Sequence, residues 1–210
     1  MSIYSKIAGK RLVRLEALSD GLFAIAMTFL IMDLKEPASL IANSENQLID
    51  DLLSMKSNFV AFVVSFVALG VFWTVQTTQM TYIKNSDRIL NWISLIFLMF
   101  VSMLPFTTAL LSSHKQDDFS RILYGIHITV LSLFLLAQWN YSRKKNYLVF
   151  DESEDGDLIF NGLNKVLIIA IIVSIILISL SFISFYASVI GLAVLKVVEM
   201  IWSKFFNKKK

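Results

Sequence analysis

An acidic residue stands inside the first long apolar segment of the chain, which runs from about Leu15 to Leu34. Asp20 follows Ser19 there, and Arg14 immediately precedes the segment. An ionisable side chain at membrane depth costs about 2.5–3.5 kcal/mol on insertion scales, so we expect Asp20 to be paired or to face water. Arg14 or a polar group on the next apolar segment could be its partner. The alternative is that Ser19 and Asp20 only mark one end of a helix.

Helical geometry separates Asp20 from an apolar stripe on the same segment. At about 100° per residue, Ile25, Phe29 and Met32 lie within about 60° of one another, and Asp20 points about 140° away from Ile25. Thr28 lies about 60° to one side of Ile25 on the same scale. The stripe contains no group that could bind an ion. Periodicity alone leaves open whether it faces lipid, packs in a core or borders a pathway.

Other kinds of chemistry have little support in this sequence. The 210 residues include no cysteine, which excludes disulfides, thiolate metal sites and cysteine nucleophiles. No phosphate-binding loop, zinc motif or nucleophile elbow is visible. His114 and His127 are far in sequence from any serine or carboxylate partner, and we expect His127 to pack between helices. The sequence therefore predicts no enzyme, no metal site and no cofactor.

The composition is that of an all-α integral membrane protein. Hydrophobic residues make up 56% of the chain and charged residues 17%, with a mean hydropathy of +0.68. The apolar residues form blocks long enough to cross a bilayer about 30 Å thick. We expect one membrane domain, 1–210, with six spans. The stretch from Leu163 to Ile201 is too long for one span and should turn near Phe182–Ser188. The predicted spans are 15–34, 58–80, 90–111, 122–140, 163–182 and 185–201.

Basic residues are distributed unevenly between the two sides of such a bundle. If the N-terminus is inside, 14 basic residues lie in inner segments and four in outer loops. The positive-inside rule expects this bias. The basic Lys208–Lys210 favours an even number of spans, with both termini cytoplasmic. The acidic run Asp151–Asp157 is interpreted as a solvated inner loop. Because the basic residues lie at span ends rather than in one patch, nucleic-acid binding is not expected.

Three short motifs resemble the transmembrane protein 175 family of endosomal, lysosomal and prokaryotic potassium channels. That family begins its first span with an Arg, three residues and Phe-Ser-Asp. The matching positions here are Arg14, Leu18, Ser19 and Asp20, with Leu18 replacing the usual Phe. The ends of the second and third spans are also similar, in Gly70-Val71-Phe72-Trp73 and Leu104-Pro105-Phe106-Thr107-Thr108-Ala109-Leu110-Leu111. The family commonly has histidines shortly after this Trp, whereas this chain has Gln76 and Thr77.

The resemblance implies a homotetrameric, potassium-selective channel of the single-repeat, prokaryotic type. In that family the first helices line a central pore, and no Thr-Val-Gly-Tyr-Gly filter is present; none occurs here either. Carried over by position, Ile25, Phe29 and Met32 would form an apolar constriction, with Thr28 contributing to selectivity. The polar residues implied to brace this helix from behind are Arg14, Ser19, Asp20, Trp73 and Gln76. The expected location is the plasma membrane of a prokaryote, and the expected partners are lipid, potassium ions and three further copies.

Two other functions remain open on the sequence alone. A secondary transporter or proton-coupled carrier needs a polar site near the bilayer centre, often on a broken helix. Asp20 with Gln76 could supply such a site, but the first span contains a single Gly and no Pro. A membrane-embedded enzyme would need a cluster of catalytic residues, which the sequence lacks.

Overall fold

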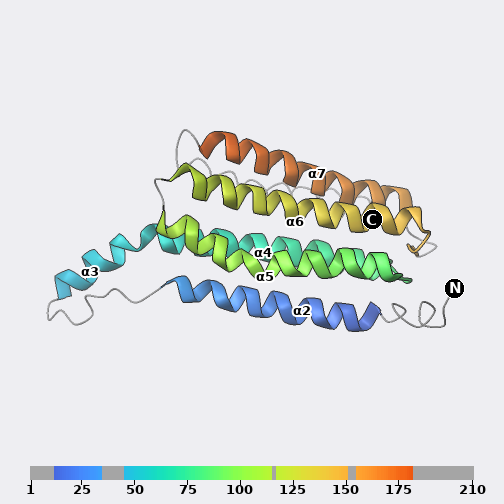
Figure 1. Cartoon of the computed structure of the whole chain (residues 1–210), viewed down its shortest axis with the longest axis horizontal. Coiled ribbons are helices and arrows are strands. Elements are labelled where there is room, and N and C mark those ends of the chain that lie inside the picture. The colour runs from blue at the N-terminus through green and yellow to red at the C-terminus, as the bar shows by residue number, and fades with distance from the viewer. Residues whose placement is uncertain (1–11, 35–44, 115–116, 151–154, 182–210) are drawn as a thin grey trace.

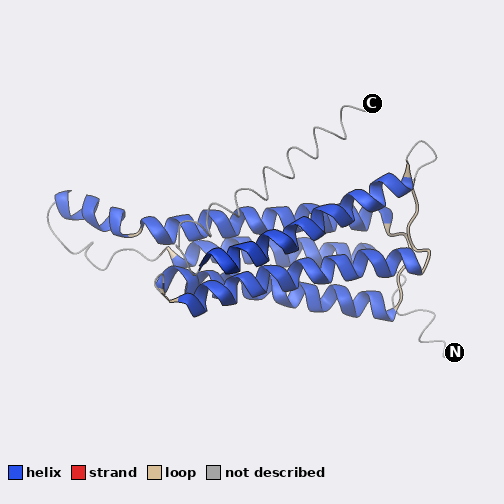
Figure 2. Ribbon diagram, turned by 90° about the horizontal axis from the view of Figure 1, so that it is seen from above, coloured by secondary structure: helices blue, strands red, loops and turns tan. Residues whose placement is uncertain are grey.

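The computed structural model describes residues 12–34, 45–114, 117–150 and 155–181, and these form a bundle of long helices (Figures 1 and 2). A short 3₁₀ helix, η1, continues the first long helix, and a ten-residue helix, α3, precedes α4. The elements are α2 (Leu12–Phe29), η1 (Leu30–Asp33), α3 (Glu45–Ser54), α4 (Lys56–Tyr82), α5 (Arg88–Ser113), α6 (Asp118–Lys144) and α7 (Gly156–Ser181).

Within the described residues, five helices are long and apolar enough to cross a membrane. They run alongside one another, with α2 and α7 on opposite sides of α4, α5 and α6 (Figure 1). The candidate spans are Leu12–Met32, Lys56–Tyr82, Arg88–Ser113, Asp118–Lys144 and Gly156–Ile176. They overlap the first five predicted spans, so the chain is an all-α, multi-pass membrane protein. The predicted sixth span, 185–201, and the predicted turn at Phe182–Ser188 lie outside the described residues.

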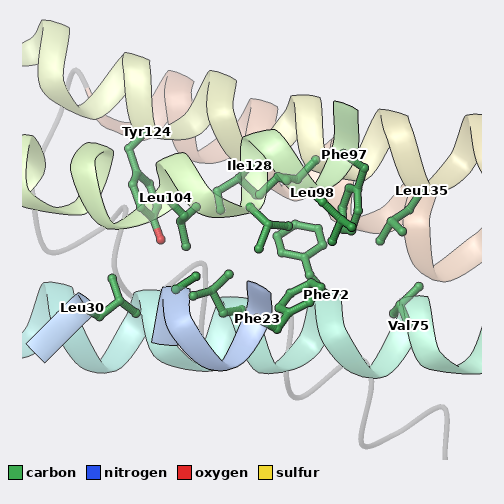
Figure 3. Packing of buried hydrophobic residues seen from close by; sticks show 14 of the residues in the cluster. Phe23, Leu30, Phe72, Val75, Phe97, Leu98, Leu104, Tyr124, Ile128 and Leu135 are labelled. Atoms are coloured by element: carbon green, nitrogen blue, oxygen red, sulfur yellow. The ribbon is translucent and has the colours of Figure 1, made fainter. Parts of the chain in front are cut away.

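The largest apolar core lies between α2, α4, α5 and α6 (Figure 3). Phe97 on α5 is fully buried and contacts Phe23 of α2, with ring centroids 6.1 Å apart. Leu104 and Ile128 fill the next level of the same core. Lipid tails are as apolar as these side chains, so close packing rather than expulsion of water holds the helices together. The core therefore supports α2 from one side only.

Buried polar side chains join α4, α5 and α6 at two levels. At one level, Ser94 donates to Gln138 Oε1 over 2.7 Å, and Gln138 Nε2 donates to Gln79 Oε1 over 3.0 Å. The chain of bonds ends where Gln79 Nε2 donates to the Leu135 carbonyl over 3.1 Å. All three polar side chains are almost fully buried. A buried amide without partners would be costly, so this network fixes the relative rotation of the three helices.

The second level is a cluster of hydroxyl groups and one histidine. Ser65 lies 3.0 Å from the Tyr124 hydroxyl and accepts a hydrogen bond from Thr108 over 2.8 Å. One turn away, His127 Nδ1 lies 2.9 Å from Thr107 Oγ1, and Nε2 lies 2.9 Å from the Phe100 carbonyl. The prediction that His127 packs between helices is therefore confirmed, because both ring nitrogens have partners on α5.

The start of α7 differs from the sequence interpretation. The helix begins at Gly156, seven residues before the predicted boundary at Leu163. The Asp155 carboxylate accepts from the Leu158 amide over 3.0 Å, which caps the helix. Asp157 lies in the first helical turn and forms an ion pair with Arg143. The acidic run is therefore helical rather than a loop at Gly156 and Asp157, although Asp157 is exposed to solvent as predicted. Hydropathy does not detect a capped acidic helix start.

Candidate functional site

Two faces of α2 have opposite environments. Residues at three- and four-residue spacing face α4, α5 and α6, which is the periodicity of a helix packed on one side. These buried residues are Leu12, Leu15, Ser19, Phe23, Ala26 and, on η1, Leu30. The remaining side chains of α2 are exposed or only partly buried by the described residues. Figure 1 shows α2 at the edge of the bundle.

The predicted apolar stripe lies on this uncovered face. Ile25 is 51% exposed, Phe29 53% and Met32 67%. The prediction treated all three as parts of one α-helix, but Met32 belongs to the 3₁₀ turn that follows Phe29. A 3₁₀ helix has three residues per turn, so Met32 aligns with Phe29 rather than lying on the far side of Ile25. The three side chains are thus spread over a smaller angle around the helix axis than uniform α-helical geometry implied.

Thr28 lies beside the stripe, and its hydroxyl group has a defined orientation. The side chain is exposed, and Oγ1 donates to the Ala24 carbonyl of the preceding turn over 2.7 Å. A hydroxyl has one proton and two lone pairs. Because the proton is directed to the backbone, the lone pairs of the oxygen face away from the helix. Thr28 therefore presents an acceptor, the polarity that suits a cation.

Two hydrogen bonds connect the opposite flank of α2 to α4. Trp73 Nε1 donates to Asp20 Oδ1 over 2.9 Å, and Ser19 donates to Gln76 Oε1 over 2.6 Å. The amide nitrogen of Gln76 is buried without a partner among the described residues. Arg14 is exposed and forms no ion pair within the described part of the chain. Four of the five predicted polar residues are thus brought together, and Arg14 is not.

Sequence reasoning did not identify two further buried amides, Gln79 on α4 and Gln138 on α6. Gln79 and Gln138 form the buried network described above, and a row of threonines continues on the exposed side of α4. Thr74 and Thr81 each donate to the carbonyl four residues earlier, over 2.8 and 3.0 Å. Amide side chains within otherwise apolar spans were the available signal for the buried pair. Among the described residues, no group of three or more His, Cys, Asp or Glu side chains could hold a metal ion.

Comparison with known proteins places this geometry in a family. Residues 14–105 match the family model described as endosomal/lysosomal potassium channel TMEM175. A potassium channel of Streptomyces collinus is 32% identical over 147 residues, which is 68% of this chain and 69% of that protein. A potassium channel of Chamaesiphon minutus is 28% identical over 144 residues, covering 67% of this chain and 70% of the relative.

A solved structure has the same arrangement of helices. It is the crystal structure of a lysosomal potassium-selective channel TMEM175 homologue from Chamaesiphon minutus, with a TM-score of 0.77. The alignment covers 90% of this chain and 96% of that chain at 25% identity. The residues that match the family model include α2 from Arg14 onward, with its Ser19-Asp20 pair and its apolar stripe. From the sequence match, the shared fold and the shared length, we conclude that this chain belongs to the TMEM175 family.

Proposed function

We propose that this protein is a potassium-selective channel subunit whose ion pathway is lined by α2. The observation that carries the proposal is the uncovered apolar face of α2 with a threonine acceptor beside it. The family membership and the potassium channels of similar length support the choice of ion. The pathway runs along the axis of a homotetramer, in which the exposed faces of four α2 helices meet.

Ile25, Phe29 and Met32 form the narrow part of this pathway. Four copies of such a stripe around one axis make an apolar ring without any ion ligand. Stripping water from an ion without replacing it is very costly, so a narrow ring of this kind blocks ions when it is dry. Hydrophobic constrictions gate by such dewetting. Substitution with smaller side chains should therefore admit water and increase ion flux.

Thr28 provides the polar contact nearest to the ring. Four outward-facing hydroxyl oxygens can replace part of the hydration shell of a cation. Potassium gives up its shell more easily than sodium, so partial replacement favours potassium. Ser19, Asp20, Trp73 and Gln76 act from the other side of α2, where they hold the helix against α4. They position the pore-lining face and do not contact the ion; Arg14, which has no such contact, belongs to the same family motif.

The test is potassium and sodium flux through liposomes that contain only this protein. Ile25→Ala should increase flux several-fold. Ile172→Ala on α7 is a matched control, because Ile172 has almost the same exposure, 50%, and is not on α2. Unchanged flux in Ile25→Ala, or an equal change in the control, would exclude α2 as the pathway. Potassium movement that stops without a proton gradient would favour the alternative, a proton-coupled carrier.

A further inference from the structure

Two connecting segments that are far apart in sequence are paired at one end of the bundle. This end, where α4 and α6 finish and α5 begins, is called the basic end below. The Lys84 amide donates to the Tyr147 carbonyl, and the Val149 amide donates to the Tyr82 carbonyl, both over 2.9 Å. These bonds form an isolated antiparallel bridge between the α4–α5 and α6–α7 connections. The side chains of both connections are thereby held next to each other.

Asp87 ties the same two connections together through its side chain. Its Oδ1 accepts from the Leu90 amide over 2.8 Å, and its Oδ2 accepts from the Tyr141 hydroxyl over 2.6 Å. The Tyr147 hydroxyl also donates to this carboxylate. Both carboxylate oxygens are therefore engaged with the protein. Asp87 thus contributes one negative charge to the basic end, with its carboxylate bonded to the protein.

Four cations lie in the two paired connections or at the helix ends beside them, and none of the four has an ion pair within the described part of the chain. They come from both connections: Lys84, Arg88, Lys144 and Lys145. All four are exposed, and Lys145 is close enough to Asp87 to contribute to lowering its pKa. Arg143 is different, because it pairs with Asp157 and lies 4.2 Å above the ring of Phe160. The four cations and Asp87 together carry a net charge of +3.

The cluster borders exposed apolar side chains. Trp92 follows Arg88 by one helical turn on the same face of α5 and is 56% exposed. Ile89 and Val149 are also more than half exposed beside the basic residues. Tryptophan is enriched where a membrane protein crosses the headgroup region. An anion that combines a charged group with hydrocarbon fits this surface better than a free phosphate ion does.

We propose that the basic end binds an anionic phospholipid through Lys84, Arg88, Lys144 and Lys145. The phosphate group contacts the lysines of the two paired connections, and an acyl chain lies along Ile89 and Trp92. Basic clusters at the ends of transmembrane helices bind lipid headgroups in this way. The site is independent of the proposed ion pathway, because none of its residues is on α2. Its test therefore requires no measurement of flux.

The experiment measures thermal unfolding of the full chain in neutral detergent with added phosphatidylglycerol, phosphatidylcholine or inorganic phosphate. Phosphatidylglycerol should raise the melting temperature of the wild type, and the other two should not. Each removed charge should weaken the apparent affinity for phosphatidylglycerol about fivefold. The double variant Lys84→Gln/Lys145→Gln should therefore need much more phosphatidylglycerol for the same rise in melting temperature.

Two control variants separate this site from general surface charge. Lys165→Gln removes an exposed cation from α7, outside the cluster, and should respond like the wild type. Lys84→Arg/Lys145→Arg keeps both charges and should also respond like the wild type, which guards against a folding defect in the glutamine variant. The proposal is overturned if inorganic phosphate stabilises the protein equally, or if Lys165→Gln loses as much affinity as the double variant.

Discussion

The hydroxyl group of Thr28 combines an internal hydrogen bond with an exposed oxygen, and this combination predicts its mutational behaviour. Thr28→Ala removes the oxygen but leaves the helix backbone bonds intact, so assembly should be preserved. The potassium-to-sodium permeability ratio should fall several-fold, measured as a shift in reversal potential. Thr28→Ser keeps the oxygen and should keep most of the selectivity. Equal potassium-to-sodium permeability ratios in the wild type and Thr28→Ala would show that Thr28 does not contribute to selectivity.

Asp87 predicts a pH dependence of stability at the basic end. Desolvation raises the pKa of this carboxyl, but hydrogen bonds from Leu90, Tyr141 and Tyr147 and the charge of Lys145 together lower it below 3.8. A carboxyl whose pKa is lower in the folded state stabilises the fold above its unfolded pKa, and this contribution is lost as pH falls through the folded pKa. The loss is therefore expected only below about pH 4, where the unfolded pKa of Asp lies.

Thermal unfolding in detergent between about pH 3 and pH 6 measures this effect, in the range set by the Asp pKa. The melting temperature of the wild type should fall at the acidic end. Asp87→Asn keeps an acceptor for the Leu90 amide, which is the helix-capping bond. It should melt at a lower temperature than the wild type at pH 6 and show a shallower fall toward pH 3. If the melting temperatures of the two proteins fell in parallel with pH, the charge of Asp87 would not contribute to stability.

At the scale of elements, α2 is attached to α4 by two side-chain hydrogen bonds at a single level. Asp20→Ala removes the acceptor of the Trp73 indole and should cost about 1 kcal/mol, a typical value for one hydrogen bond. We expect a lower melting temperature or a lower yield of assembled protein. Asp20→Asn retains an acceptor for the Trp73 indole and should lose less stability than Asp20→Ala. Normal assembly of Asp20→Ala with altered ion selectivity would instead assign Asp20 to the pathway.

The elements that were predicted well are those whose boundaries coincide with a change in polarity. Spans α4, α5 and α6 extend only a few residues beyond the predicted runs, because each run ends where charged or polar residues begin. The start of α7 at Gly156 was missed, since it depends on a capping bond from Asp155. The 3₁₀ turn that carries Met32 was also missed, because a change in helix type leaves apolar periodicity almost unaltered.

The contacts between elements were predictable only where a sequence motif supplied them. The link from Ser19 and Asp20 to Trp73 and Gln76 was anticipated through the family motif. The bond between Gln79 and Gln138 was not, because these residues are 59 positions apart and their contact depends on the rotation of two helices. The pairing of the two connections at the basic end was also missed, because it too depends on how distant helices are placed. Such long-range backbone contacts leave no periodic signal in one sequence.

At the scale of the whole molecule, the proposed function depends on further copies of the chain. The proposed pathway exists only if several α2 helices surround one axis. We expect the detergent-solubilised protein to have about four times the 23.9 kDa mass of one chain, measured by light scattering or native mass spectrometry. Ile25→Asp should weaken this assembly, because it buries a charge at the ring. A functional monomer would exclude the central pathway.

The orientation of the molecule can be tested because the chain contains no cysteine. The positive-inside rule predicts that the exposed Ser113, at the end of α5, lies outside. The same rule predicts that Lys210, which is outside the described residues, lies inside. A membrane-impermeant thiol reagent added to intact cells should label Ser113→Cys and leave Lys210→Cys unlabelled. Labelling of Lys210→Cys from outside would contradict six spans with both ends in the cytoplasm.

Because its polar attachment is confined to a single level, α2 can tilt about that level. The polar attachment is at Ser19 and Asp20. Beyond it, Phe23, Ala26 and Leu30 pack against the bundle through apolar contacts. Phe29 lies nine residues beyond Asp20, or about 13 Å at 1.5 Å per residue. A tilt of about 10° therefore moves Phe29 by about 2 Å along this arm. In the homotetramer proposed above, an outward tilt of all four α2 helices would widen the ring by about twice the displacement of one Phe29.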